Sequence, residues 1–584
     1  MTTEGRGITR RELLKKAGWS LSALTMARFL SSKPAAAAAR AAASPDPGAP
    51  LMLARVRPSS AMERVALAAF DDTHRRFADG SVELLLWPGD LAKLRDLGTD
   101  FEITCTDLAR RDAELKANPA PVPLVAPPGG ATNYRVLADY ERELKELPKT
   151  YPHHARLITL PHKTFEGRTV YGVEISANVG VVDGRPTIYY DGIHHAREWP
   201  AGEFPMIWAY YLLENYGKDP RVTAILDKAR VVVIPVVNPD GFHKSRHGFE
   251  NSNLGIVAGG QEAYWRKNRR AWGGQEDEIP NNPLAYGVDP NRNYAFLWGA
   301  TTGGVAGVSP AVDPVPVYAS TSPNPYDQTY FGPEPISEPE IKNTAEFLLG
   351  RNVTGMITSH TNGKLILRPW GHTEEPSVDE DFMASLGDEM QAITGYVSQI
   401  GLSLYPTTGT TDDWYYAAAG GFGYTFEHGG SAFHPPYNNN DAPGRFWDKV
   451  CAAFLLHAEA AADATKHCVI RGRAVESSDP LRGVPVSLNG HKEFETPMWP
   501  QGVNGTGSLL LQRTSTHEVI DINAASALDG TIEWHINPTT RPLEAAANRT
   551  EALRVRISAP GRTPVVRDIQ LARGGSVDLG PVAF

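Results

Sequence analysis

The chain has 584 residues, of which 41% are apolar and 21% are charged. This balance is typical of globular proteins and excludes a wholly disordered chain and a multi-span membrane protein. The net charge of -10 disfavours a protein that coats nucleic acid, because such proteins normally carry excess positive charge. The three cysteines, Cys105, Cys451 and Cys468, are too few for a disulfide-stapled scaffold and leave at least one thiol without a partner in the chain.

The first segment, residues 1–43, has the order of a secretory signal. Arg10 and Arg11 precede two leucines, a weakly apolar stretch covers 17–30, and an alanine-rich tract covers 35–43. The adjacent arginines predict a twin-arginine (Tat) signal peptide of a bacterial exported protein, with an extracellular or periplasmic destination. A basic amphipathic helix of the mature protein is the alternative. No later run of 18 apolar residues follows, so we expect no membrane anchor after signal removal.

Residues 51–118 predict a small α+β domain. Short apolar runs at 51–56, 82–86 and 101–105 indicate strands, and residues 62–70 and 91–97 indicate helices. Residues 119–130 then form a proline-rich stretch, which predicts an extended, exposed linker because proline has a fixed φ and no N–H to donate.

Two larger segments follow the linker. Residues 131–466 alternate buried-type strands, such as 231–237 (VVVIPVV), with helical stretches such as 341–349, which indicates an α/β domain. In residues 468–584 the apolar side chains of 484–488, 553–557 and 565–571 largely fall at every second position, with glycine and proline between the segments. That pattern predicts a C-terminal β-sandwich domain.

Three residues in the α/β segment are candidate metal ligands. His195 and Glu198 follow the apolar stretch 187–190, and their spacing of three points both side chains the same way on a helical or strand-to-helix turn. An imidazole and a carboxylate so placed can chelate a zinc-type ion, although a salt-bridged surface turn has the same spacing. His360 ends an apolar strand, where α/β sheets place their chemistry, but alone it also fits a core histidine.

Eight motifs in chain order decide between these alternatives. The motifs are Gly192–Trp199, Pro235–Phe242, Trp265–Arg269, Gly287–Tyr294, Tyr330–Glu338, Ser359–His360, Tyr405–Trp414 and Tyr424–Glu427. With these motifs the chain resembles the zinc carboxypeptidases of the carboxypeptidase A/B family over about 133–466, and most closely their bacterial secreted members with a B-type pocket aspartate. The resemblance implies a mixed eight-stranded sheet flanked by helices, with the site at the strand ends.

The resemblance makes His195, Glu198 and His360 the ligands of one Zn²⁺ per chain, a set for which carboxypeptidase A is itself the standard example. His194 departs from the family pattern, and its spacing of four from Glu198 is also chelating. Spacing therefore leaves the first ligand open, and the family register favours His195. By the same resemblance, Asp289 would accept a hydrogen bond from a ligand imidazole and fix its tautomer.

The resemblance also implies the activity, a zinc-dependent carboxypeptidase that hydrolyses the C-terminal peptide bond of peptides and proteins. Glu427 would act as the general base, taking a proton from the attacking water and passing it to the leaving amine. Arg266 would face the oxyanion of the tetrahedral intermediate.

Five further positions match the family's substrate-binding residues. Arg292, helped by Asn291, would grip the terminal carboxylate of the peptide with parallel N–H bonds. Tyr405 would close over it, and Arg197 would guide it in. Asp412 lies seven residues after Tyr405, where B-type members carry an aspartate, which favours a C-terminal Lys or Arg, with dual basic and apolar acceptance as the alternative.

The remaining expectations concern regulation and competing functions. Residues 51–118 occupy the place of the family's inhibitory prosegment, which predicts a zymogen cleaved in the linker. One alternative is a relative that trims cell-wall peptides, against which Asn291, Arg292 and Tyr405 argue. Another is an inactive binding protein that uses its β-domain, although no zinc ligand is lost. We expect a monomer whose partners are peptide C-termini, with no nucleic acid.

Overall fold

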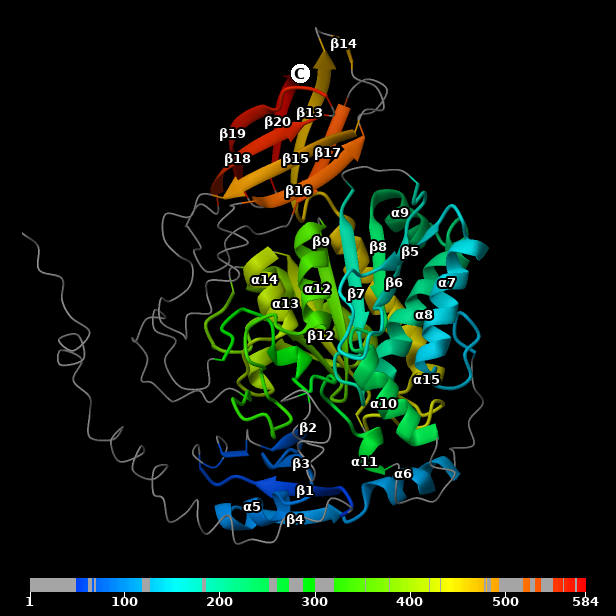
Figure 1. The fold of residues 1–584 in the computed structure, drawn as a ribbon, viewed down its shortest axis with the longest axis vertical. Coiled ribbons are helices and arrows are strands. Elements are labelled where there is room, and N and C mark those ends of the chain that lie inside the picture. Colours follow the sequence, from blue (N-terminus) through cyan, green and yellow to red (C-terminus); the bar gives the residue numbers. More distant parts are fainter. Residues whose placement is uncertain are drawn as a thin grey trace, which may run out of the picture. The chain divides into compact units, whose positions relative to one another are not determined.

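Figure 1 shows the computed structural model of the chain, which describes most of its residues but not all of them. The predicted signal peptide, residues 118–125 and most of the predicted helix 62–70 lie outside the described residues. The described residues are 49–60, 63, 66–67, 70–117, 126–180, 185–250, 260–271, 287–299, 320–351, 353–377, 379–419, 421–430, 432–476, 479–480, 485–492, 518–525, 531–536, 550–559, 561–572 and 575–584.

The N-terminal elements form an antiparallel sheet in the order β2-β3-β1-β4. Its apolar face packs Val56, Leu84 and Leu86 against Leu94 of the helix α5. The three predicted strands and the helix 91–97 are found within one residue, whereas β2 and α6 were not predicted. The elements are β1 (Met52–Arg57), β2 (Asp71–Arg76), β3 (Val82–Leu86), α5 (Asp90–Leu97), β4 (Asp100–Cys105) and α6 (Leu108–Ala117).

A second sheet of eight strands, in the order β11-β10-β12-β9-β7-β8-β6-β5, forms the centre of the following segment. The neighbours β12, β9, β7 and β8 run parallel, and antiparallel pairs flank them. The predicted mixed eight-stranded sheet is confirmed. Its strands are β5 (Ala155–Thr159), β6 (Tyr171–Ile175), β7 (Thr187–Gly192), β8 (Arg230–Ile234), β9 (Val353–Thr361), β10 (Leu365–Arg368), β11 (Val397–Ile400) and β12 (Phe422–His428).

Helices cover both faces of this sheet (Figure 1). Tyr189 and Tyr190 are consecutive in β7 and therefore point to opposite faces. Tyr189 contacts Phe347 of α12, whereas Tyr190 contacts Trp208 of α8 and Phe454 of α15. The helices are α7 (Leu137–Thr150), α8 (Pro200–Asn215), α9 (Pro220–Lys228), α10 (Pro239–Glu250), α11 (Gly260–Ala263), α12 (Pro339–Gly350), α13 (Glu380–Thr394), α14 (Thr411–Ala419) and α15 (Pro443–Ala462), with short 3-10 turns η4 (Pro290–Arg292) and η5 (Gly401–Ser403).

Every residue of β7, β8, β9 and β12 is buried, as expected for parallel strands covered on both faces. Their carboxyl ends meet at one edge of the sheet. In the ladder between β9 and β12, His360 is paired with Glu427. Because paired residues of neighbouring strands point to the same face, this register places the two side chains together.

The C-terminal strands form two further four-stranded sheets. One has the order β14-β13-β17 with β20 beside β13, and the other the order β16-β15-β18-β19. None of the helices in the described ranges is long and apolar enough to cross a membrane. The strands are β13 (Cys468–Glu476), β14 (Asp479–Pro480), β15 (Pro485–Lys492), β16 (Glu518–Ala525), β17 (Thr531–Ile536), β18 (Thr550–Ser558), β19 (Val565–Ala572) and β20 (Ser576–Ala583).

Candidate functional site

The turn between β7 and α8 carries two of the candidate ligands. β7 ends at Gly192 and α8 begins at Pro200, so His195 and Glu198 lie on a strand-to-helix turn. A side chain at position 192 could not fit, because its Cβ would lie 1.9 Å from the carbonyl oxygen of Ala201. The glycine thus lets the first turn of α8 approach the strand and aims the turn over the sheet edge.

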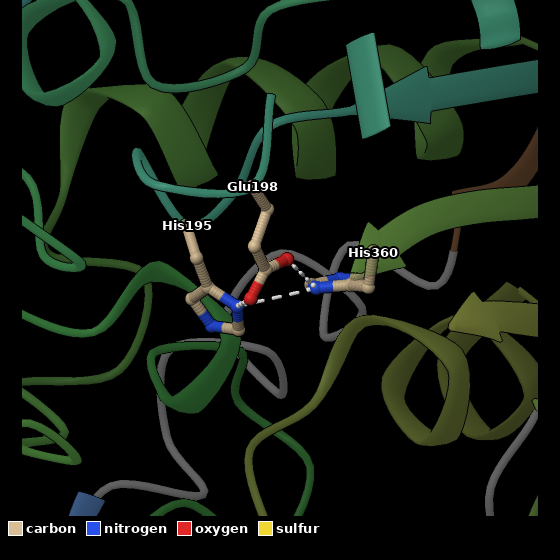
Figure 2. Close-up of side chains that lie close together, drawn as sticks. All are labelled: His195, Glu198 and His360. Carbon is tan, nitrogen blue, oxygen red and sulfur yellow. Dashed lines mark hydrogen bonds and ion pairs between the residues drawn. The ribbon is translucent and has the colours of Figure 1, made fainter. Parts of the chain in front are cut away.

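Three buried side chains converge at this edge (Figure 2). Nδ1 of His195 lies 2.7 Å from Oε1 of Glu198, and Nδ1 of His360 lies 3.0 Å from Oε2 of the same carboxylate. The two imidazole Nδ1 atoms are 3.2 Å apart. Among the residues that the structure describes, this is the one group of three or more His, Cys, Asp or Glu side chains whose ligand atoms all lie within 4.8 Å of one another.

The donor set fits a zinc ion. Burial lowers the pKa of His195 and lowers the pKa of His360 to about 4, so both imidazoles are neutral at pH 7 and can offer a lone pair. Two neutral imidazoles and one carboxylate, with a further position left for water or substrate, form a catalytic zinc set. The predicted ligands His195, Glu198 and His360 are therefore brought together as a candidate metal site.

Asp289 supports the site from behind. Its Oδ1 lies 3.0 Å from Nε2 of His195, and its Oδ2 accepts hydrogen bonds from Arg266 at 2.8 and 3.1 Å. Burial would raise the pKa of Asp289, but the cations around it, Arg266 above all, hold that pKa well below its usual range. The charged carboxylate places the His195 proton on Nε2 and leaves Nδ1 free to bind metal.

His194 does not belong to the metal cluster. Its Nε2 lies 2.9 Å from the hydroxyl of Tyr294, and its ring stacks on His360 with centroids 5.5 Å apart. Burial lowers its pKa well below the usual value. His194 is therefore a neutral core side chain behind the site, which resolves the ambiguity that spacing left open.

Glu427 lies beside the ligands on β12 and is only 4% exposed. Burial raises its pKa to about 7, opposed by the nearby His360, Arg266 and Arg292. A carboxylate with a pKa near neutrality both accepts and returns protons at physiological pH, which suits a general base. No hydrogen-bond partner meets its Oε2 in the described part of the chain.

The predicted carboxylate clamp is buried and braced. Arg292 donates from Nε to the carbonyl of Ser320 and from Nη1 to the carbonyl of Asn291, and its Nη2 lies 3.4 Å from the hydroxyl of Tyr405. Asn291 accepts from the backbone N–H and the hydroxyl of Thr411, both at 2.9 Å. These contacts fix the guanidinium next to Tyr405 at the end of η4.

Asp412 lies in the first turn of α14 and is 6% exposed. Burial, and then the charge of the neighbouring Asp413, raise its pKa to about 7. Asp413 accepts a backbone hydrogen bond from Gly371 on each of its carboxylate oxygens, at 3.1 and 3.0 Å, so it braces the loop at Gly371.

The strand β2, which was not predicted, reaches this site. Arg197 is fully buried and is bound by both carboxylate oxygens of Asp71, from β2. Asp71 also accepts from the indole of Trp87 at 2.8 Å. Burial would raise the pKa of Asp71, but Arg197 outweighs it and lowers that pKa. Arg197, which is predicted to guide the peptide, is thus occupied by a carboxylate from the N-terminal sheet.

Comparisons with known proteins agree with this geometry. Residues 140–442 match the family profile described as zinc carboxypeptidase. Rat (Rattus norvegicus) carboxypeptidase A1 is 30% identical over 274 residues, which cover 45% of this chain and 55% of the relative. The zinc carboxypeptidase of Saccharothrix mutabilis subsp. capreolus is 26% identical over 308 residues, which cover 51% of this chain and 63% of the relative. The chain spans about half the length of several curated relatives it matches.

Solved structures show the same fold. The crystal structure of carboxypeptidase A from Helicoverpa armigera has a TM-score of 0.54 at 20% identity and covers 71% of this chain and 98% of that one. The crystal structure of thrombin activatable fibrinolysis inhibitor has a TM-score of 0.53 at 19% identity, with the same coverage.

Proposed function

The chain belongs to the zinc carboxypeptidase family, and from this premise we propose that it hydrolyses the C-terminal peptide bond of peptides and proteins. The observation that carries the proposal is the meeting of His195, Glu198 and His360 at one point beside the buried carboxyl of Glu427. The clamp at Arg292, one short turn after Asp289, supplies what an exopeptidase needs to recognise a free carboxylate.

The mechanism follows from the charges of these side chains. His195, Glu198 and His360 would hold a zinc ion, which would supply a lowered pKa for the attacking water and polarisation of the scissile carbonyl. Glu427 takes the proton from the attacking water and returns it to the leaving amine. Arg266, held by Asp289, stabilises the negative charge that develops on the carbonyl oxygen. Asp289 thereby orients both a metal ligand and the oxyanion donor.

Substrate binding divides among the remaining side chains. Arg292 binds the terminal carboxylate, Tyr405 closes over it, and Arg197 guides the peptide once Asp71 has left. Asp412 recognises the side chain of the terminal residue and favours Lys or Arg.

The other segments have proposed roles as well. Residues 1–43 direct export by the twin-arginine route, and residues 51–118 form an inhibitory prosegment removed by cleavage in the linker 119–130. The catalytic domain extends over 131–466, and residues 468–584 form an appended β-sandwich.

The direct test is hydrolysis of blocked peptides ending in Arg, Lys or Leu by the linker-cleaved chain. We expect zinc-dependent release of the terminal residue, measured by amine detection, that is abolished by a chelator and restored by stoichiometric Zn²⁺. Peptides with an amidated C-terminus serve as the matched control, because they lack the carboxylate that Arg292 binds. Cleavage that survives complete metal removal, or that is equal for amidated peptides, would contradict the proposal.

The proposed role of Asp412 predicts a pH-dependent specificity. Since burial raises the pKa of this carboxyl to about 7, it is neutral below that pH and negative above it. The ratio of kcat/KM for Lys release to that for Leu release should therefore rise between pH 6 and pH 8. Asp412→Asn should lower this ratio at pH 8 by about 10- to 100-fold, as for loss of a hydrogen bond to a charged group.

The control for this prediction is Asp388→Asn, at an exposed position of α13. It should leave the ratio and its pH dependence unchanged. An Asp412→Asn enzyme with the wild-type ratio at pH 8 would show that this carboxyl does not set specificity.

A further inference from the structure

The strand β2 bulges toward the catalytic site. It is an edge strand, and its pairing with β3 is interrupted between Asp72 and Arg76. His74 lies in this bulge with φ of 65°, a left-handed conformation that non-glycine residues rarely adopt. The bulge carries the imidazole out of the N-terminal sheet and leaves the residue only 4% exposed.

The His74 imidazole lies between two functional side chains. Its Nδ1 lies 3.3 Å from Oε2 of Glu427, and its Nε2 lies 3.1 Å from the hydroxyl of Tyr405. The rings of His74 and Tyr405 are 5.5 Å apart. In the described part of the chain, Nδ1 of His74 and Oε2 of Glu427 have no hydrogen-bond partner, so the two atoms face each other in a buried space where each needs one.

Neighbouring contacts hold the bulge in place. Asp72 accepts from the backbone N–H of His74 at 2.7 Å and forms a two-bond ion pair with Arg76. Arg76 also donates to the carbonyl of Leu404, next to Tyr405, at 3.1 Å. The strand is therefore anchored on both sides of the imidazole, by Asp71 on Arg197 and by Arg76 on the Tyr405 segment.

We propose that His74 is a built-in competitor of the peptide substrate, which joins the catalytic carboxyl of Glu427 to the hydroxyl of Tyr405 and so blocks both catalysis and carboxylate binding in the intact chain. The inference rests on the proposed function and assigns the inhibition of the peptidase activity in the intact chain to one side chain. His74 is not a metal ligand, because it lies outside the cluster of the three ligands. The contact at Nδ1 occupies the carboxylate oxygen that would meet the attacking water.

The contact with Tyr405 has a second effect. The Tyr405 hydroxyl lies 3.4 Å from Nη2 of Arg292, so the tyrosine already covers the clamp. His74 contacts the same hydroxyl and holds it there. A peptide must displace both rings before its carboxylate can reach the guanidinium. The release of Glu427 from His74 and the exposure of Arg292 to the peptide therefore occur together.

The test compares intact, zinc-loaded chains. His74→Asn keeps a residue that tolerates positive φ but cannot bridge Glu427 and Tyr405. Arg75→Ala is the matched control, because Arg75 belongs to the same bulge and its side chain is 49% exposed. We expect His74→Asn to hydrolyse a lysine-ending peptide about tenfold faster than wild type, and to bind a lysine-ending peptide with a reduced, non-cleavable terminal bond about tenfold more tightly by calorimetry. Arg75→Ala should match wild type in both.

The outcomes separate this inference from the proposed function. If linker-cleaved wild type is active but His74→Asn equals wild type in rate and affinity, the role of His74 is overturned and the peptidase function stands. If the hydrolysis rate and the affinity of Arg75→Ala rise as much as those of His74→Asn, general loosening of β2 explains the gain. The role of His74 is then overturned as well. If linker-cleaved wild type and His74→Asn neither cleave nor bind peptides, the proposed function fails first and the inference with it.

Discussion

Replacement of Glu427 by glutamine is expected to lower kcat by about 10²–10⁴ while leaving zinc bound. Glutamine has nearly the same shape but cannot accept a proton from water. Because burial raises the pKa of Glu427 to about 7, the wild-type carboxyl is protonated below that pH and becomes an active base above it. The wild-type rate should therefore rise with pH through the neutral range, whereas the residual rate of Glu427→Gln should lack this step.

The measurement is steady-state kinetics on the intact, zinc-loaded chain, in which Glu427 has this buried environment, with zinc content determined by atomic absorption. Glu340→Gln is a matched control, since Glu340 is also fully buried and burial raises its pKa to about 8. Its carboxyl is neutral at pH 7, so glutamine should replace it with little effect on kcat. A Glu427→Gln enzyme that keeps more than half of the wild-type kcat would remove this residue from the mechanism.

Removal of the Arg266 side chain is expected to lower both kcat and the stability of the fold. Arg266→Ala should lower kcat by about 10²–10³, as for removal of one oxyanion donor, with a smaller change in KM. The same variant leaves Asp289 buried with one partner fewer, so its free energy of unfolding should also fall, by about 3–5 kcal/mol.

Arg266→Lys separates the two contributions. Lysine keeps a positive charge beside Asp289 but lacks the planar fork of the guanidinium. It should recover much of the lost stability in denaturant titrations while kcat stays well below wild type. Recovery of kcat in proportion to stability would mean that Arg266 acts only through the fold.

The sequence predicted the central sheet, because long apolar strands carry strong local signals. The eight motifs in order, rather than any one of them, predicted the three side chains that form the candidate metal site. The strand expected over 231–237 ends at Ile234, since Pro235 has no N–H for the ladder. The pairing of His360 with Glu427 could not be predicted, because it depends on which strands become neighbours. Each residue alone shows only that it lies near a strand end.

The contribution of β2 was missed for a physical reason. Its sequence, DDTHRR, lacks the alternation of apolar and polar residues that indicates a strand. The strand lies at a sheet edge, is interrupted by a bulge, and makes its important contacts with residues far away in the chain, such as Arg197 and Glu427. Local patterns carry no information about such partners.

His360 and Glu427 are paired in neighbouring strands. This pairing determines how destabilising substitutions in the sheet should affect the rate of peptide hydrolysis. Backbone ladders set the separation of the two side chains, and a slip of one residue between β9 and β12 would turn a side chain to the opposite face of the sheet. Registers between these two states lack the ladder hydrogen bonds and are therefore unstable. Destabilising substitutions in the sheet should therefore reduce the fraction of competent molecules, counted by titration with a tight inhibitor, while each surviving molecule works at the full wild-type rate.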